Sequence, residues 1–255
     1  MPDKPFTDNA ILGGLLVIRQ PRRGHRVGHD AILLAAATPA RPGEHVVELG
    51  AGVGAAGLAL ARRVPGTRVN MVELDPELAA FAAKNAELNR LSENVRAIVL
   101  DVTAPPRAFV AAGLIPGSAA RVLMNPPFND PARQRASPDP GRRLAHAAPA
   151  GLLATWVRRA ASLLAPSGTL TLIWRADGLA DVLAALGRGF GGIVVMPVHP
   201  KPDAAAIRVL VRATKGSRAP LALLPGLTLN DADRRPTPEA EAVLRAVAVL
   251  PLARL

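Results

Sequence analysis

The chain has no cysteine and no tyrosine, and aromatic residues make up only 3% of its 255 positions. The lack of cysteine excludes disulfides and thiolate metal ligands, and five scattered histidines argue against a zinc site. Scarce aromatic rings argue against a wide surface on which many nucleotide bases stack. We therefore expect no metal, and if the partner is a nucleic acid, a single base held in a pocket.

Long apolar runs are also missing. No run approaches the ~18 residues that a membrane span needs, and the first ten residues lack the apolar core of a signal peptide. These absences predict a cytoplasmic protein with no membrane partner. Nothing in the sequence indicates an oligomeric state.

Acidic residues are outnumbered, with 20 Asp and Glu against 31 Lys and Arg, which gives a formal charge of +11. Clustered cations attract phosphate, so this balance permits a nucleic-acid partner. Only four of the basic residues are lysine, and such arginine and alanine richness also arises from GC-rich coding without any function. The distribution of the charge is therefore more informative than its total.

Short β-branched runs alternate with segments of helical apolar spacing, which predicts an α/β fold with a doubly wound, mostly parallel sheet. We expect an N-terminal strand at 11–19, a helix capped by Asp30, and a C-terminal helix at 238–250. The last two strands are joined by a short loop and should pair antiparallel, giving one antiparallel strand among seven. The seven strands expected in the sheet are residues 44–50, 67–74, 95–100, 121–124, 168–174, 191–198 and 206–213; the helices between them include 54–64, 75–91 (opened by Asp75 as N-cap) and 150–165.

A glycine-rich turn follows the first strand of this sheet, in the run VVELGAGVGAAG. Gly50, Gly52 and Gly54 permit a tight turn and close approach to a ligand, and the next helix presents free N–H groups to it. The same letters contain G-x-G-x-x-G, the dinucleotide fingerprint. The loop alone therefore indicates an adenosine-bearing cofactor without choosing between NAD and another.

Acidic residues occupy three successive strand ends: Glu48, Glu73 and Asp101. A carboxylate two positions before the first glycine suits a cationic or amine-bearing ligand better than a pyrophosphate. Glu73 is placed to hold ribose hydroxyls, and Asp101 to accept a hydrogen bond from an adenine amino group. Each alone is explained as a polar strand end, but three together favour a cofactor site.

The fourth strand ends in Asn125-Pro126-Pro127-Phe128. Two prolines stiffen the segment and delete two N–H donors, while carbonyls and the Asn125 side-chain oxygen remain as acceptors. Such a segment suits a planar group with two N–H donors, an exocyclic amine or an amide, on which Phe128 would stack. The alternative reading is a proline-rich turn with a core phenylalanine.

Together these residues resemble the class I S-adenosylmethionine-dependent methyltransferases. The resemblance implies a Rossmann-like domain at 41–213, an N-terminal hairpin/helix extension at 1–40 packed on it, and a basic loop and C-terminal helix at 214–255 within the same domain. It implies that Glu48 lies near the methionine portion of S-adenosyl-L-methionine and that Gly50, Gly52 and Gly54 shape the pocket. Glu73 would hold the ribose, and Asp101 with the Val102 backbone would meet the adenine.

Asn-Pro-Pro-aromatic is similar to the motif of methyltransferases that act on adenine N6, guanine N2 and glutamine N5. The stretch 13–36 and the loop ending in RRLAHA look like bacterial enzymes of the valine-tRNA adenine-N6 type, whose target is the adenosine 3′ of the anticodon. That group carries a tyrosine where this chain has Phe128, so stacking is kept and a hydroxyl contact is not. The resemblance implies that Asn125, Pro126 and Phe128 are the catalytic residues. It also implies that the partner is RNA, with tRNA as the substrate.

An RNA substrate predicts basic residues around the strand ends, and the long loop at 129–147 is rich in arginine. A solvated flexible loop explains the same composition. Methylation of guanine N2 in rRNA, of a protein glutamine or of a small molecule remains an alternative, as do a nicotinamide oxidoreductase and a module without catalysis. The residues expected to contact RNA are Arg26, Arg133, Arg135, Arg142 and Arg143.

Overall fold

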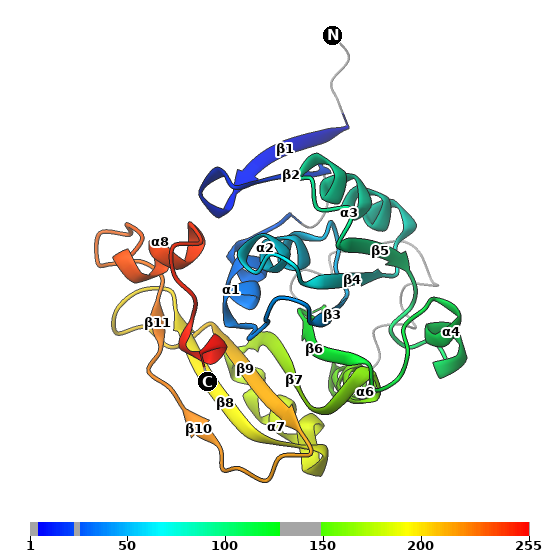
Figure 1. Ribbon diagram of the computed structural model, residues 1–255. Coiled ribbons are helices and arrows are strands. Elements are labelled where there is room, and N and C mark those ends of the chain that lie inside the picture. Colours follow the sequence, from blue (N-terminus) through cyan, green and yellow to red (C-terminus); the bar gives the residue numbers. More distant parts are fainter. Residues whose placement is uncertain (1–4, 23–25, 128–148, 255) are drawn as a thin grey trace, which may run out of the picture.

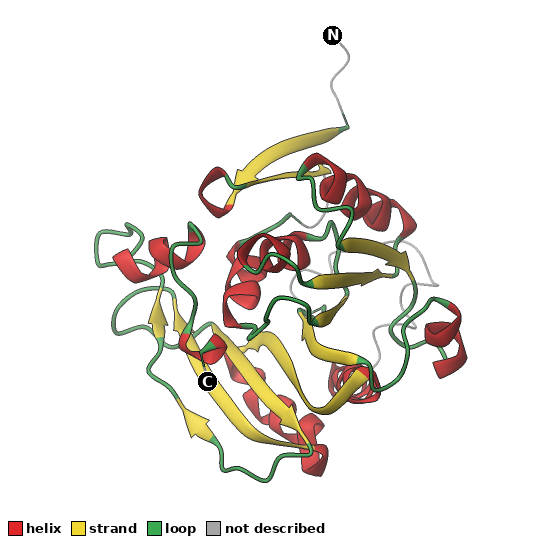
Figure 2. Ribbon diagram, viewed as in Figure 1, coloured by secondary structure: helices red, strands yellow, loops and turns green. Residues whose placement is uncertain are grey.

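The computed structural model describes residues 5–22, 26–127 and 149–254. A large mixed sheet carries helices on both faces, and a two-stranded hairpin lies apart from it beside one helix (Figures 1 and 2). None of the helices in these ranges combines the length and apolar character that crossing a bilayer requires.

The large sheet has nine strands in the order β10-β8-β9-β7-β6-β3-β4-β5, with β11 also paired to β8. Strand β9 runs antiparallel to β7 and β8, and the other pairs are parallel, as predicted for β3 to β9. The two extra strands have two residues each and come from a segment expected to be irregular. The strands are β3 (His45–Leu49), β4 (Arg68–Glu73), β5 (Val95–Val99), β6 (Ala119–Met124), β7 (Leu164–Arg175), β8 (Phe190–His199), β9 (Arg208–Lys215), β10 (Ala222–Leu223) and β11 (Leu227–Thr228).

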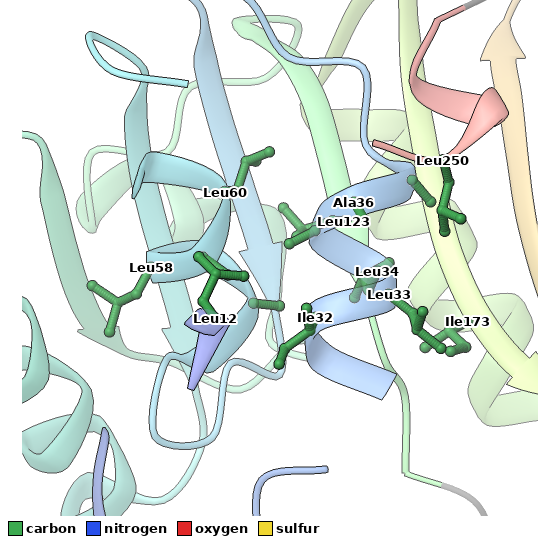
Figure 3. Close-up of a cluster of buried hydrophobic side chains, with 14 of the residues drawn as sticks. Leu12, Ile32, Leu33, Leu34, Ala36, Leu58, Leu60, Leu123, Ile173 and Leu250 are labelled. Atoms are coloured by element: carbon green, nitrogen blue, oxygen red, sulfur yellow. The ribbon is translucent and has the colours of Figure 1, made fainter. Parts of the chain in front are cut away.

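The helices bury one apolar cluster on each face of the sheet. The first cluster lies under α1 (His29–Ala37), α2 (Ala55–Arg63), α3 (Pro76–Leu88) and α8 (Pro238–Leu244). Figure 3 shows Leu33 of α1 beside Ile173 of β7 in this cluster. The second lies under α4 (Pro106–Ala111), α6 (Pro149–Leu163) and α7 (Leu179–Leu186). Short 3-10 turns complete the chain at η1 (Leu12–Gly14), η3 (Ala176–Gly178), η4 (Gly187–Gly189) and η5 (Pro251–Ala253).

Several predicted boundaries are wrong. The expected strand at 11–19 is a hairpin of β1 (Phe6–Ile11) and β2 (Leu16–Pro21), because two glycines with positive φ turn the chain between them. Asp30 is not an N-cap: Gly28 takes that position, and Asp30 pairs with Arg208 at 2.9 Å. The C-terminal helix ends at Leu244, since Ala246 has a left-handed φ of 62°. Asp75 is confirmed as the cap of α3, accepting from the Glu77 N–H at 2.8 Å.

Two asparagines, one in the last turn of α3 and one directly after it, hold the N-terminal hairpin. Asn89 accepts from the Val17 N–H at 2.9 Å and donates to the Val17 carbonyl at 2.8 Å. Asn85, one turn earlier, repeats this with the N–H and carbonyl of Arg19 at 2.8 and 2.9 Å. Asn85 also donates to the Val53 carbonyl in the glycine-rich turn, at 3.0 Å. The hairpin, α3 and the glycine-rich turn are therefore joined through one buried side chain.

Candidate cofactor and methyl-acceptor site

Four strands end at the same edge of the sheet, because β5, β4, β3 and β6 are neighbours and parallel. The chain runs outward from β3 through β4 to β5 and then returns to the other side of β3 as β6. Ligands of doubly wound sheets bind where the strand order reverses in this way. The residues predicted to bind the cofactor, together with Asn125, lie at the ends of these four strands or directly after them, so the topology brings them to one edge.

The glycine-rich turn after β3 needs its glycines for conformation and for space. Gly50, Gly52 and Gly54 have φ values of 71°, 55° and 85°, which favour glycine. A Cβ on Gly50 would lie 2.5 Å from the Trp156 ring, and one on Gly54 would lie 2.8 Å from the Met71 sulfur. A Cβ on Gly52 would meet nothing within 4 Å, so this part of the turn borders open space. Gly50 and Gly54 therefore pack closely against neighbouring side chains, and Gly52 faces open space.

Glu48 lies beneath this turn with only 4% of its surface exposed. Its Oε2 accepts a hydrogen bond from the Gly57 N–H at 2.8 Å, and a Cβ on Gly57 would come within 2.6 Å of that oxygen. Burial raises the pKa of Glu48 to about 8; the Gly57 hydrogen bond opposes the shift and the charge of Glu73 adds to it. A cation bound nearby would favour the ionised form. The carboxyl is thus suited to an amine-bearing ligand.

Glu73 at the end of β4 connects two loops. Its Oε2 accepts from the Gly52 N–H at 2.7 Å and its Oε1 from the Asp75 N–H at 3.0 Å. A carboxylate has about four acceptor positions, so both oxygens keep capacity for a ligand hydroxyl. The carboxylate is held in position by the backbone and is only partly buried, as a ribose-binding residue requires. Next to it, Leu74 is 64% exposed and offers apolar surface at the same strand end.

Hydrogen bonds with Asp101 and with α6 hold the loop after β5 in position. Asp101 accepts from the Thr103 N–H at 2.7 Å, and the Val102 side chain is buried. Arg159 of α6 donates to the Val102 carbonyl at 3.2 Å and to the Ala104 carbonyl. Its guanidinium lies 4.0 Å above the Phe109 ring. Burial lowers the pKa of Arg159, and the charge of Asp101 opposes that shift.

Trp156 and Arg159 were not predicted as part of the site. They lie three residues apart on α6 and so share a face, from which one touches the turn after β3 and the other the loop after β5. The amphipathic pattern of residues 150–165 predicts a buried face without indicating which loops it meets. Leu74 was missed as well, although an apolar residue between two acidic ones at a strand end is a usable signal.

Asn125 follows β6 directly. Its Oδ1 is buried and has no hydrogen-bond partner within the described part of the chain. Pro126 is buried and Pro127 exposed, so the stiff segment is anchored at one proline. An unpaired buried acceptor costs free energy, which makes this atom a candidate receptor for a donor brought by a ligand.

The remaining predicted residues are not gathered at this edge by what the structure describes. Arg26 is exposed and donates to Thr7 Oγ1 at 3.2 Å and to Asn9 Oδ1 at 3.0 Å, both on β1. Phe128 and the four arginines of the long loop, Arg133, Arg135, Arg142 and Arg143, lie outside the described residues.

The residues present fit a nucleoside cofactor with a cationic tail. Gly52 borders open space, Glu73 keeps free acceptor capacity, and Glu48 is a buried carboxyl that a cation would ionise. Residues 25–196 match the family model described as the methyltransferase small domain. The chain belongs to this family. This confirms the expectation of an S-adenosylmethionine-dependent methyltransferase domain with a Rossmann-like fold.

Individual relatives agree with the family match. A tRNA1(Val) (adenine(37)-N6)-methyltransferase of Porphyromonas gingivalis is 32% identical over 171 residues, covering 62% of this chain and 61% of its own length. A release factor glutamine methyltransferase of Chlorobaculum tepidum is 29% identical, covering 62% and 54%. The chain therefore spans less than two thirds of the length of these relatives.

A solved structure covers more of the chain. The Agrobacterium tumefaciens protein Atu636, described as a predicted O-methyltransferase, has a TM-score of 0.74 and 33% identity, covering 87% of this chain and 98% of its own. TYW2 of M. jannaschii, solved in complex with AdoMet, has a TM-score of 0.58 at 16% identity and shows the shared fold.

The raised pKa of Glu48 predicts a loss of stability with rising pH. Between its ordinary value of about 4.5 and its folded value of about 8, the folded state holds a proton that the unfolded state has lost. The free energy of unfolding should fall through this window by about 2–5 kcal/mol from this group. Urea unfolding at pH 5.5 and pH 8.5 measures the difference. Glu48→Gln should abolish most of it, and an equal pH dependence in the variant would contradict the assignment.

Arg159 predicts a positioning effect on cofactor binding. Arg159→Met removes the two hydrogen bonds that hold the loop after β5, so calorimetry should show S-adenosylhomocysteine binding weakened about tenfold. Arg158→Met is the matched control, since the neighbouring Arg158 is exposed and, among the described residues, donates to Thr155. Equal affinities in the two variants would contradict the role given to Arg159.

Proposed function

We propose that this protein is an S-adenosylmethionine-dependent N-methyltransferase whose target is an exocyclic amine, adenine N6 in tRNA. The observation that carries the proposal is the buried Oδ1 of Asn125, which has no hydrogen-bond partner among the described residues and lies directly after β6, beside the glycine-rich turn. The relative from Porphyromonas gingivalis, named for a tRNA adenine, supports the substrate. A tRNA substrate would be met in the cytoplasm. The domain is proposed to span 41–213, with the extension at 1–40 packed on it and the basic loop and C-terminal helix at 214–255 as part of the same domain.

Residues of three strand ends would hold the cofactor. Glu48 would lie near the methionine amine, Gly50, Gly52 and Gly54 would line the pocket, and Glu73 would accept from the ribose hydroxyls. Asp101 and the Val102 backbone would meet the adenine, in a loop that Arg159 holds. When bound, S-adenosylmethionine supplies a methyl group already activated by a positive sulfonium.

The chain's own contribution at the acceptor is orientation. The lone pair of an adenine amine is delocalised into the ring, so the nitrogen is a poor nucleophile. Asn125 Oδ1 and a neighbouring carbonyl would accept its two hydrogens and turn the lone pair toward the methyl group. Pro126 and Pro127 keep competing N–H donors out of this place. Holding the reactants in line is the main source of acceleration for such a displacement.

A protein glutamine is the second candidate. It is favoured by the release factor glutamine methyltransferase, which is similar to this chain at nearly the same identity as the tRNA enzyme. An amide presents the same two N–H donors as adenine N6, so Asn125 does not separate them. The Agrobacterium protein is described as a predicted O-methyltransferase. A hydroxyl acceptor offers a single hydrogen, which would use only one of the two acceptors in this chain.

Transfer of a labelled methyl group separates these substrates. The protein is incubated with labelled S-adenosylmethionine and either unmodified total tRNA or total cellular protein, and the products are digested. We expect the label in N6-methyladenosine. Label in methylglutamine, with none in nucleosides, would replace the tRNA proposal by the glutamine one.

Asn125→Ala tests the acceptor role. Turnover on tRNA should fall about 10²–10³-fold, as when one aligned hydrogen-bonding group is removed from other active sites. The affinity for S-adenosylhomocysteine should stay within about twofold, because Asn125 is not among the residues expected to hold the cofactor. Asn94→Ala, an exposed asparagine before β5 at the opposite edge, is the control. Normal turnover of Asn125→Ala would refute the role of this side chain.

A further inference from the structure

A cavity lies at the opposite edge of the sheet from the glycine-rich turn. It has a volume of about 310 Å³ and is bordered by the starts of β6 and β7, the end of β9 and the C-terminal segment. Figure 1 shows the C-terminal end of the chain beside β9, and Arg212 of β9 donates to the Leu252 carbonyl at 3.0 Å. Arg121 precedes Asn125 by four residues, so this cavity lies about 13 Å along β6 from the acceptor site. It is a separate place on the molecule.

Four guanidinium groups line this cavity: Arg41, Arg121, Arg212 and Arg254. No acidic residue lines it among those the structure describes, and the carboxylate that reaches the group from outside is Glu44, held by Arg121 at 2.7 and 3.0 Å. Arg212 is 92% buried, with 8% of its surface exposed, and burial followed by repulsion from Arg121 lowers its pKa. Among the described residues that line the cavity, four are therefore basic and none is acidic.

Hydroxyl groups complete the lining. Thr169 is 6% exposed and accepts from Arg121 Nη1 at 3.3 Å, so its own O–H can turn elsewhere. Ser167 lies beside it on the rim. Guanidinium forks and hydroxyls are the donors that recognise tetrahedral oxyanions, with the forks matching pairs of phosphate oxygens. A cavity near 300 Å³ has room for a phosphate together with a small attached group.

We propose that this cavity binds a phosphate group, through Arg41, Arg121, Arg212 and Arg254 with help from Thr169 and Ser167. Arg41 and Arg254 are exposed at its mouth, so they meet the ligand from solvent, while Arg121 and Arg212 form the floor. The phosphate comes either from a small phosphomonoester or from the phosphodiester backbone of RNA.

The site is tested by calorimetric titration with inorganic phosphate and with pyrophosphate at low ionic strength. The protein and ligand solutions contain the same concentration of chloride. We expect saturable 1:1 binding to the unaltered protein. The double variant Arg41→Gln, Arg254→Gln changes exposed residues only, so it should fold normally and bind at least about tenfold more weakly. The matched control Arg188→Gln, Arg234→Gln removes the same charge from exposed positions away from the cavity and should bind as the unaltered protein does.

Absence of saturable binding, or an equal loss in both double variants, overturns the proposal. Because all three proteins are also titrated with S-adenosylhomocysteine, a failure here is distinguishable from a failure of the methyltransferase assignment. Uridine 5′-monophosphate and a uridine hexanucleotide, neither of which contains adenine, separate the two sources. Binding of the monophosphate that is sensitive to Arg41 and Arg254 identifies a phosphomonoester; such binding of the hexanucleotide alone identifies the RNA backbone.

Discussion

The carboxylate of Glu73 is the interaction on which the site depends, because it ties together the loops that follow two neighbouring strands. It accepts from Gly52 in the turn after β3 and from Asp75 at the start of α3. A turn of three left-handed glycines is intrinsically flexible, and this carboxylate, the Trp156 ring and the Asn85 amide hold it from three sides. The entropy lost in ordering this turn is offset by contacts within the folded chain. A ligand therefore binds a turn that already has its final shape.

Charge is distributed unevenly between the two edges of the sheet. At the edge where β3, β4 and β5 end, carboxyl groups gather and one of them, Glu48, is buried deeply enough to favour its neutral form. At the edge where β6 and β7 begin, guanidinium groups gather around one carboxylate. The overall charge of +11 describes neither edge. One edge suits a cation and the other an anion, and they are separated by the length of a strand.

The strands, their direction and the strand-end residues could be predicted because each depends on local pattern. The antiparallel pairing of β8 and β9 followed from loop length alone, and Asp75 from its place before Pro76. Features that depend on tertiary contact could not be predicted. Asp30 stands where the sequence predicts a helix cap, but its carboxylate forms an ion pair with Arg208, 178 residues away.

The same limit applies to the site. Glycines 50, 52 and 54 are visible in the sequence, but the reason for Gly50 is the ring of Trp156, more than a hundred residues later. Arg159 reads as one of many arginines on an amphipathic helix, and only the fold shows that it holds the loop of Asp101. Strands β10 and β11 are too short to carry a periodic pattern, so their pairing with β8 appears only in the structure.

Asn85 of α3 and Asn89, directly after it, affect whether copies of this molecule can pair through the hairpin. A strand with an open side is a template onto which a strand of another molecule can add. On β2 that side is occupied, because Asn85 and Asn89 imitate a partner strand at Val17 and Arg19. The side-chain amides therefore prevent a strand of another molecule from adding to the hairpin along β2.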